Sequence, residues 1–281
     1  MKEILLDYSV VEIRDKFVEL GLKKFRATQT YEWLTSYIPF GEMSNLSKED
    51  RELLNSKFVD LPLQIEKCFD SKTDGTKKFL YRLTETGDLI EGVLLKYKYG
   101  YTLCVSTQVG CRMGCKFCAS GLDGLKRNLT AGEILSQVLA VNKYLGGTNT
   151  ERLVTNVVLM GSGEPLDNFN NVVKFIRLVQ SPSSLNISPR KITISTSGLV
   201  DKIYELTNLD LKMTLTVSLH ATIDDVRKKI MKVANAYSVN DLMEALKYYY
   251  QKTNKRIAFE YILLDCNTTD EDVKNIIKIS H

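Results

Sequence analysis

The stretch "YTLCVSTQVGCRMGCKFCASG", residues 101–121, joins a segment of alternating apolar and polar residues to a loop with three cysteines. The first part, residues 101–107, has the pattern of a β-strand. Cys111, Cys115 and Cys118 follow within eight positions. Thiolates are soft ligands that suit zinc or an iron–sulfur cluster. The stretch therefore predicts a metal-binding loop that follows a strand.

The number of cysteines in this loop limits which metal centre it can hold. A structural zinc site needs four closed ligands. The loop has no His nearby, and Cys104 precedes it by seven residues on the expected strand. Three cysteines leave one position open, as in a four-iron four-sulfur cluster with one iron free for another ligand. A zinc knuckle and a chance grouping of cysteines are the alternatives.

The composition is that of a soluble globular protein: 281 residues, 44% hydrophobic and 26% charged. This length favours one α/β domain of about 200 residues with a small accessory domain. The net charge of +4 permits a nucleic-acid partner without requiring one. No apolar run approaches the ~20 residues that a membrane span needs. The charged N-terminus lacks a signal-peptide core, so we expect a cytoplasmic protein without a membrane segment.

Three regions differ in their sequence pattern. Residues 1–75 are predicted to form a small helical accessory domain, and a helix start is expected at Ser47. Residues 76–100 alternate as in short antiparallel strands. Residues 101–281 alternate strands with helices, which indicates parallel βαβ units. In that last region we expect strands at 101–107, 153–160, 191–195, 212–219 and 257–264, and helices at 130–145, 168–180, 199–207, 222–231, 239–252 and 269–280.

Several passages together resemble one known family. The spacing C-x3-C-x2-C after the first strand is that of radical S-adenosylmethionine (SAM) proteins. The passage "CVSTQVGCRMGCKFCASGLDGLKRNLTAGEI" is similar to the RlmN/Cfr family of radical SAM RNA methyltransferases. Further passages match in the same order: "FRATQTYEW", "MGSGEPLDN", "SPRKITISTSG" and "TVSLHA". The resemblance covers essentially the whole chain and implies an α/β fold, a (β/α)6 radical SAM barrel behind a helical accessory domain.

The resemblance implies roles for the cofactor-binding residues. The three loop cysteines, Cys111, Cys115 and Cys118, would ligate a 4Fe-4S cluster. The residues implied to contact SAM follow the later strands: Gly163, Glu164, Ser195, Ser218, Leu219 and His220. Taken alone, a Gly–Glu–Pro sequence is more typical of a turn, and a single His after a strand is usually structural. Their place at the carboxyl ends of parallel strands favours function.

Two further residues would act on the substrate in this family. The resemblance makes Glu91 the base that removes a proton from an adenine carbon. It makes Cys104 the thiol that resolves a protein–RNA crosslink by forming a disulfide with a late cysteine. A solvated strand carboxylate and an inert buried thiol are the alternative readings of the two residues. Cys68 and Cys266 match no motif and are expected to be structural or incidental.

The implied reaction is methylation of carbon 2 of an adenosine in 23S rRNA and tRNA. "GEP" favours RlmN over a Cfr-type enzyme, which methylates carbon 8 and has "GEA". An electron donor such as flavodoxin or ferredoxin is implied, and a monomer is expected. Cations beside aromatic residues suit RNA contact, and the candidates are Lys23, Lys24, Phe25, Arg26, Tyr31, Trp33, Lys116, Lys126 and Arg127, although Trp33 is more typical of a core residue.

The chain departs from the family pattern near its end. Five strand–helix units are expected here, where the family has six. The sixth would carry another SAM-contacting Asn and the cysteine that is methylated. "KVANAY" and "LLDCNTTDED" also differ from the family's usual sequences. We therefore expect a fragment or a truncated gene product that binds the cluster but does not complete methyl transfer, and an inactive iron–sulfur or zinc RNA-binding protein is the alternative.

Overall fold

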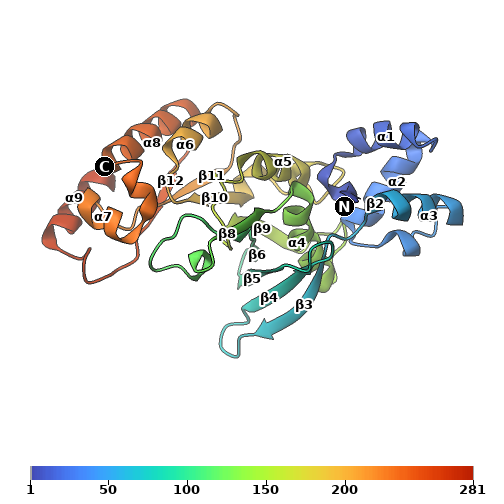
Figure 1. The fold of residues 1–281 in the computed structure, drawn as a ribbon, viewed down its shortest axis with the longest axis horizontal. Coiled ribbons are helices and arrows are strands. Elements are labelled where there is room, and N and C mark those ends of the chain that lie inside the picture. The colour runs from blue at the N-terminus through green and yellow to red at the C-terminus, as the bar shows by residue number, and fades with distance from the viewer. Residues whose placement is uncertain (1, 281) are drawn as a thin grey trace.

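The computed structural model describes residues 2–280, which build around one eight-stranded mixed sheet (Figure 1). The strand order across the sheet is β12-β11-β10-β9-β6-β5-β4-β3. The half from β6 to β12 is parallel and the half from β3 to β6 is antiparallel. The site discussed below lies on the parallel half, at the carboxyl ends of its strands.

The parallel half contains the five strand–helix units that the sequence predicts, within the described residues. Each strand except the last is a short, largely buried segment, as expected where helices cover a parallel sheet. The strands are β6 (Gly100–Cys104), β9 (Val154–Leu159), β10 (Ile192–Thr196), β11 (Thr214–Ser218) and β12 (Ile257–Glu260). The α/β fold class expected from the sequence is thus confirmed.

Helices follow these strands in chain order. Thr130 and Ser238 each begin a helix with a complete capping box, which satisfies backbone N–H groups of the first turn. The helices of this half are α4 (Ala131–Tyr144), α5 (Phe169–Gln180), α6 (Val200–Thr207), α7 (Asp224–Ile230), α8 (Val239–Thr253) and α9 (Asp270–Ser280). Within residues 2–280, no helix combines the length and the apolar character that crossing a bilayer requires.

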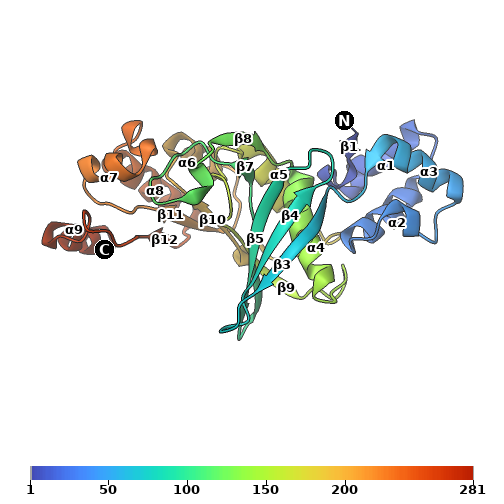
Figure 2. The ribbon, with the colours of Figure 1, turned by 60° about the horizontal axis from the view of Figure 1, so that its bottom comes forward.

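One end of the antiparallel half projects beyond the helices, as Figure 2 shows, and α4 lies against β3. It consists of β3 (Leu63–Asp70), β4 (Lys77–Leu83) and β5 (Leu89–Tyr97). The sequence predicts a helical region up to residue 75, so the expectation for β3 is wrong. This strand is largely exposed on both faces, so its sequence lacks the alternation that marks a half-buried strand.

The N-terminal region packs against the start of α4. It comprises β1 (Glu3–Ile4), α1 (Val10–Glu19), α2 (Lys24–Thr35), α3 (Lys48–Lys57) and β2 (Phe58–Val59). The Gly132 N–H donates to Asp7 Oδ1 at 2.6 Å. A Cβ at Gly132 would lie 2.8 Å from the Asp7 nitrogen, so only glycine permits this close approach. One continuous apolar core then joins the N-terminal helices to the sheet.

Candidate active site

The strand register places the predicted site residues on one face of the sheet. Cys104 lies opposite Val93 of β5, and Glu91 is two positions away on that strand, so Glu91 and Cys104 share a face. The register continues through β9 and β10 to Ser195, then across β11 to Ser218. Ser218 lies opposite Glu260 of β12. The opposite face carries the fully buried residues Leu103, Val157, Ile194 and Leu215.

Glu260 holds the two serines and was not identified from the sequence. Its Oε2 accepts hydrogen bonds from Ser195 Oγ at 3.0 Å and from Ser218 Oγ at 2.9 Å. A carboxylate that ends a parallel strand is a signal that could have indicated it. The expected strand at 257–264 ends early, at Glu260. The structure thus adds a carboxylate to the predicted set of strand-end residues.

Gly163 and Glu164 follow β9 in a tightly packed turn. Gly163 has φ +107°, and a Cβ there would lie 2.6 Å from Gln108 Cβ, so glycine is required. Glu164 is buried, and its carboxylate accepts the Ser197 N–H at 2.7 Å and the Leu166 N–H at 3.0 Å. Burial raises the pKa of this carboxyl, which the backbone donors oppose. The turn therefore presents a positioned acidic group inside the site.

His220 follows β11 in a strained conformation. Its φ is +54°, in the left-handed region that non-glycine residues seldom adopt. Its Nδ1 accepts the Ile262 N–H at 3.1 Å, and the Asn267 side chain donates to its carbonyl at 2.6 Å. Burial lowers the pKa of the imidazole. A neutral ring that accepts at Nδ1 carries its proton on Nε2, which leaves a donor for a ligand.

The base of the cysteine loop is fixed by a two-stranded ribbon. Strand β7 (Gln108–Gly110) enters the loop and pairs with β8 (Leu125–Asn128), which leaves it. The Cys111 N–H donates to the Gly124 carbonyl at 2.9 Å. Gly110 has φ +76°, and a Cβ there would lie 2.0 Å from that carbonyl oxygen. The loop can close in this way only with glycine at position 110.

The tip of the cysteine loop rests on the segment around α7. The Lys116 N–H donates to the Ile230 carbonyl at 2.9 Å. The Phe117 ring meets the His220 ring edge-on, with the centroids 4.7 Å apart. Cys115 and Phe117 pack against a small apolar cluster formed by Ala221, Ile230, Met231 and Val233. The loop is therefore held at its tip by residues far along the chain.

The three loop cysteines lie near one another and differ in exposure. Cys111 is buried, Cys115 is partly buried and Cys118 is exposed. Burial, reinforced by the two neighbouring cysteines, raises the pKa of Cys115 to about 11. Among the described residues, no group of three or more His, Cys, Asp or Glu side chains closes around a position for a metal ion. All six cysteines of the chain are free, so the disulfide implied for Cys104 is not present.

Comparisons with known proteins agree with this arrangement. A family model described as the radical SAM superfamily matches residues 105–279. A second, described as the N-terminal domain of the ribosomal RNA large subunit methyltransferase, matches residues 4–59. A Clostridium novyi (strain NT) protein described as "probable dual-specificity RNA methyltransferase RlmN" is 46% identical over 284 residues, covering 100% of this chain and 80% of its own.

The chain belongs to the RlmN family of radical SAM methyltransferases. A Clostridium botulinum (strain Alaska E43 / Type E3) protein with the same description is 49% identical, and the match covers 99% of this chain and 79% of that protein. A crystal structure of a radical SAM methyltransferase from Sphaerobacter thermophilus superposes with a TM-score of 0.92 at 34% identity. That match covers 99% of this chain and 81% of the other. The family expected from the sequence is confirmed.

The residues present fit the cofactors that the RlmN family implies. Ligands of a single ion surround one centre, whereas the cysteines of a four-iron cluster each bind a separate iron and stand farther apart. Cys111, Cys115 and Cys118 are free thiols on one loop, and thiolates are the ligands that such a cluster takes. The buried Glu164 and the strand-end serines lie on the adjoining turns and strands, as a SAM site next to such a cluster would need.

Glu91 and Cys104 lie close to each other in this member of the RlmN family. Glu91 Oε2 pairs with Lys78 Nζ at 2.5 Å, and its side chain is 46% exposed. Burial raises the pKa of the Cys104 thiol to about 11, and the nearby charges of Glu91 and Glu260 add to the effect. A carboxylate that reaches solvent can approach a substrate base. The thiol, by contrast, is protonated at neutral pH until another group removes its proton.

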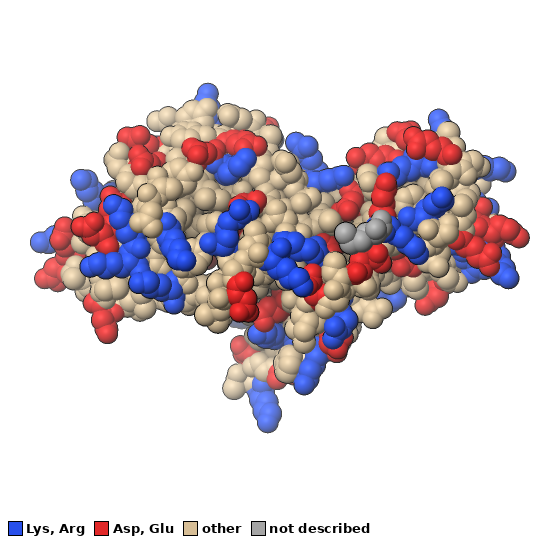
Figure 3. All heavy atoms as spheres, in the orientation of Figure 1, with Lys and Arg blue, Asp and Glu red and all other residues tan. Residues whose placement is uncertain are grey.

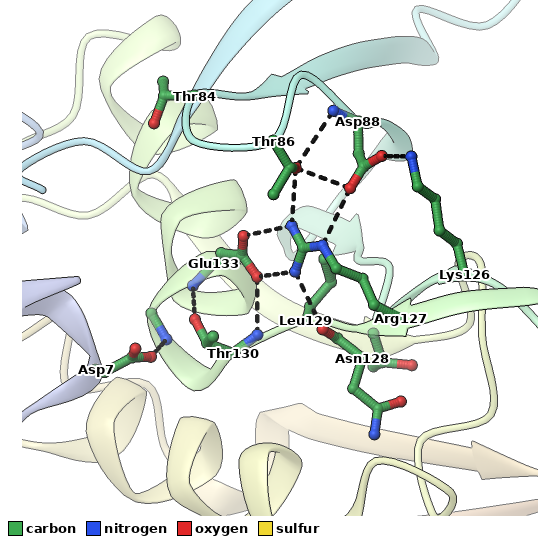
Figure 4. A network of polar contacts seen from close by, with 12 residues as sticks. Asp7, Thr84, Thr86, Asp88, Lys126, Arg127, Asn128, Leu129, Thr130 and Glu133 are labelled. Carbon is green, nitrogen blue, oxygen red and sulfur yellow. Dashed lines mark hydrogen bonds and ion pairs between the residues drawn. The ribbon is translucent and has the colours of Figure 1, made fainter. Parts of the chain in front are cut away.

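A network of charges joins the loop exit to two other parts of the RlmN-family fold, the start of α4 and the turn before β5 (Figure 4). The Arg127 guanidinium donates to both carboxylate oxygens of Glu133, at 2.8 and 2.9 Å, and to Asp88 at 3.0 Å. Lys126 also donates to Asp88, which precedes β5. Burial would raise the pKa of Asp88, but its hydrogen bonds with Lys126, Thr86 and Arg127 hold it below its usual value. The network fixes β5, and with it Glu91, relative to the cysteine loop.

The structure shows that only some of the residues predicted to contact RNA are exposed. Tyr31 is buried, and Arg26 is tied to Gln29, Asn45 and Asp50. Trp33 is partly buried and its indole N–H donates to Asn45. On the face shown in Figure 3, Lys and Arg side chains gather over the end that holds α7 and the cysteine loop. Of the predicted candidates, Lys23, Lys24, Phe25, Lys116 and Lys126 are exposed. Further exposed cations lie on the cysteine loop and around α7: Arg112, Lys228, Lys229 and Lys232.

Other site residues were missed because their partners are far away in the sequence. Gln108 donates to Asp167 at 2.8 Å, and its Oε1 accepts the Glu164 N–H at 2.9 Å. Arg112 also pairs with Asp167, at 2.8 Å. These bonds connect the start of the cysteine loop to the Gly163–Glu164 turn. A hollow of about 670 Å³ between α1 and α5 lies away from the strand ends, so cavity size does not mark the site.

Proposed function

We propose that the protein methylates carbon 2 of an adenosine in 23S rRNA and in tRNA. The observation that carries this proposal is the meeting of the cysteine loop, the Gly163–Glu164 turn and the ends of β10 and β11 at one edge of the parallel sheet. The described relatives are named as dual-specificity RNA methyltransferases, which supports RNA as the substrate.

In this proposal the cysteine loop and the strand ends hold the two cofactors. Cys111, Cys115 and Cys118 bind a 4Fe-4S cluster, and the SAM contacts are Gly163, Glu164, Ser195, Ser218, Leu219 and His220. Bound together, the cluster and SAM supply the radical chemistry. Glu164 offers a carboxylate to an ammonium group. Glu260 orients the Ser195 and Ser218 hydroxyls by accepting from both.

Glu91 and Cys104 serve the RNA base. Glu91 is the acceptor for the proton on the adenine carbon, and it pairs with Lys78 while its side chain stays partly exposed to solvent. Cys104 lies on the same face and is the thiol that releases the product. The target carbon lies within a base, so the nucleotide must be unstacked to reach this face. Exposed cations on the cysteine loop and α7 bind its phosphates.

The remaining parts of the proposal concern the setting of the reaction. Flavodoxin or ferredoxin is the electron donor, and the protein acts as a cytoplasmic monomer. The mild excess of basic residues, with a net charge of +4, suits a polyanionic partner or an acidic donor protein.

The cluster is tested by anaerobic reconstitution with iron and sulfide. The wild type should gain iron, sulfide and a visible absorption band. Cys118→Ser should lose most of each, because it removes one of only three ligands. Cys266→Ser is the matched control, since Cys266 is also exposed but lies before α9. Equal cluster content in the two variants contradicts the assignment, and so does zinc in place of iron.

The substrate atom is tested by product analysis. The methyl-carrying cysteine that the family implies is expected in a sixth strand–helix unit, so the assay uses this chain joined to that unit of an RlmN relative. The reconstituted protein receives SAM, a reductant and either an rRNA fragment or tRNA, and the nucleosides are separated by mass spectrometry. Modification at carbon 2 is expected, and modification at carbon 8 contradicts the proposal. Glu91→Gln should lower the product yield by about 100-fold, a typical loss for a general base. Glu66→Gln is the control, because Glu66 is another ion-paired strand carboxylate, bound to Arg82 at 3.0 Å.

A further inference from the structure

Arg227 is the largest fully buried side chain described in this protein, and its hydrogen bonds all go to carbonyl groups rather than carboxylates. It projects from α7 toward the ends of β10 and β11. Its Nε donates to the Leu219 carbonyl at 3.1 Å, and its Nη2 donates to the carbonyls of Ser197 at 2.7 Å and Ser218 at 3.3 Å. These bonds clamp together the two strand ends that belong to the site.

One nitrogen of this guanidinium has no partner. Nη1 is buried and makes no hydrogen bond in the described structure, although it carries two N–H groups. Asp224, the acidic residue one turn earlier on α7, accepts instead from the Val239 N–H at 2.8 Å. Arginine stays protonated in proteins. The direct partners of this buried positive charge are all neutral carbonyls, and Asp224 stabilises it only through space.

A buried charge without a counter-charge is costly, so its surroundings indicate what compensates it. The cysteine loop lies directly against the same helix: the Lys116 N–H bonds the Ile230 carbonyl, and Cys115 packs on the Ile230–Met231 cluster. Arg227 and Cys115 are close enough to influence each other electrostatically. The group that would bring negative charge to this place is the set of cysteine thiolates with a bound cluster.

We propose that Arg227 is the internal counter-charge of the cysteine-bound cluster, and that its unpaired Nη1 side faces the cluster from the Cys115 side. This inference rests on the proposed function, since it requires the cluster at Cys111, Cys115 and Cys118. Arg227 is a positioning residue: it holds the ends of β10 and β11 and stabilises the negative charge of the centre beside them.

The sign of the effect follows from electrostatics. One-electron reduction makes the cluster more negative, so a nearby fixed cation favours the reduced form and raises its midpoint potential. Inside a protein such a charge is screened much less than in water, so its effect on the cluster is large enough to measure. Removing the charge should weaken the equilibrium constant for reduction by at least about tenfold, which corresponds to about 59 mV for one electron.

The experiment compares Arg227→Gln and Arg227→Met, which are neutral, with Arg227→Lys, which keeps the charge. The readout is the midpoint potential of the reconstituted cluster, measured by dithionite titration with mediators and electron paramagnetic resonance, without SAM or RNA. The midpoint potential of both neutral variants should be more negative than that of the wild type. The midpoint potential of Arg227→Lys should stay close to the wild-type value. Lys229→Gln is the control, because it removes an exposed charge from the same helix.

Each outcome decides the proposal. Loss of the cluster from both neutral variants but not from Arg227→Lys, in chains that keep the wild-type circular dichroism, also supports it. A shift no larger than that of Lys229→Gln overturns it while leaving the proposed function intact. Failure of both neutral variants to fold without a cluster makes Arg227 a structural cross-link and overturns it. A wild type that forms no cluster overturns both this inference and the proposed function.

Discussion

The two ends of the cysteine loop are supported by arginines in opposite electrostatic situations. At the loop exit, Arg127 meets two carboxylates, Glu133 and Asp88, and every charge there has a partner. Beneath the loop tip, Arg227 is completely buried and meets only carbonyl groups. In the first arrangement every charge is directly paired, and in the second the hydrogen-bond partners of the positive charge are all neutral.

The difference indicates that Arg127 has a structural role and that Arg227 has a role in the site. A paired arginine needs nothing more, so it joins β8, α4 and the turn before β5 permanently (Figure 4). An unpaired one costs free energy until a negative group arrives. Buried charges can thus be sorted by whether their partners already belong to the chain. Substitutions of Arg127 and Arg227 should therefore change the stability of cluster-free protein by different amounts. The predictions below begin with the largest effect.

Arg127→Met should destabilise the fold most. The change leaves the nearly inaccessible carboxylates of Glu133 and Asp88 with fewer donors, and the free energy of unfolding should fall by about 2–3 kcal/mol. Urea denaturation of cluster-free protein measures it. Lys126→Met is the control: this lysine contacts the same Asp88, but its side chain is 69% exposed, so about 0–1 kcal/mol is expected. Equal losses of stability in the two variants would contradict the claim that the buried ion pairs of Arg127 stabilise the fold more than the exposed one of Lys126.

Asp88→Asn should have a smaller, pH-dependent effect. At pH 7 the loss should be about 1–2 kcal/mol, because the neutral amide forms weaker bonds with the two cations. The folded-state pKa of Asp88 lies below the unfolded value of about 3.9, so its stabilisation is complete above that value and disappears as the pH falls through the folded pKa. Denaturation at several pH values should therefore show the two proteins converging below about pH 4. A constant difference would contradict the ion pairing.

Arg227→Met should have the smallest effect on stability when no cluster is bound, about 1 kcal/mol or less. The substitution loses three hydrogen bonds to carbonyls, each worth about 1 kcal/mol. It also removes the cost of an unpaired buried charge, which offsets most of that loss. Urea denaturation of the cluster-free proteins gives the comparison. A loss of stability as large as that of Arg127→Met would mean that Arg227 is as fully paired in the cluster-free protein as Arg127.

The sequence predicts those features that depend on neighbouring residues. Thr130 with Glu133 and Ser238 with Asp241 form capping boxes where expected, because such a box needs only residues three apart. Four of the five parallel strands agree closely with their predicted ranges, since buried parallel strands have continuous apolar runs. The expected strand at 257–264 is shorter because the Ile262 N–H bonds the His220 ring instead of a neighbouring strand.

Features that depend on distant residues could not be predicted. Nothing local to Arg227 indicates that it is buried, since Lys228 and Lys229 beside it are exposed. Glu260 becomes a site residue only because the register sets it opposite Ser218. The roles of Glu91 and Cys104 stay predictions, although the register places them on one face. The family resemblance supplied the cysteine assignment, and the structure supplied the charges around it.

The contact between Lys116 and the Ile230 carbonyl also bears on how the protein is made. The thiols leave the ribosome more than a hundred residues before the helix that seats them. At about 5–20 residues per second, this delay is on the order of ten seconds. During that interval the loop has no support at its tip and its sulfurs are open to oxidants. Delivery of iron and sulfide should therefore follow translation of residue 230. A protein that protects the newly made thiols from oxidation would raise the yield of cluster-containing protein.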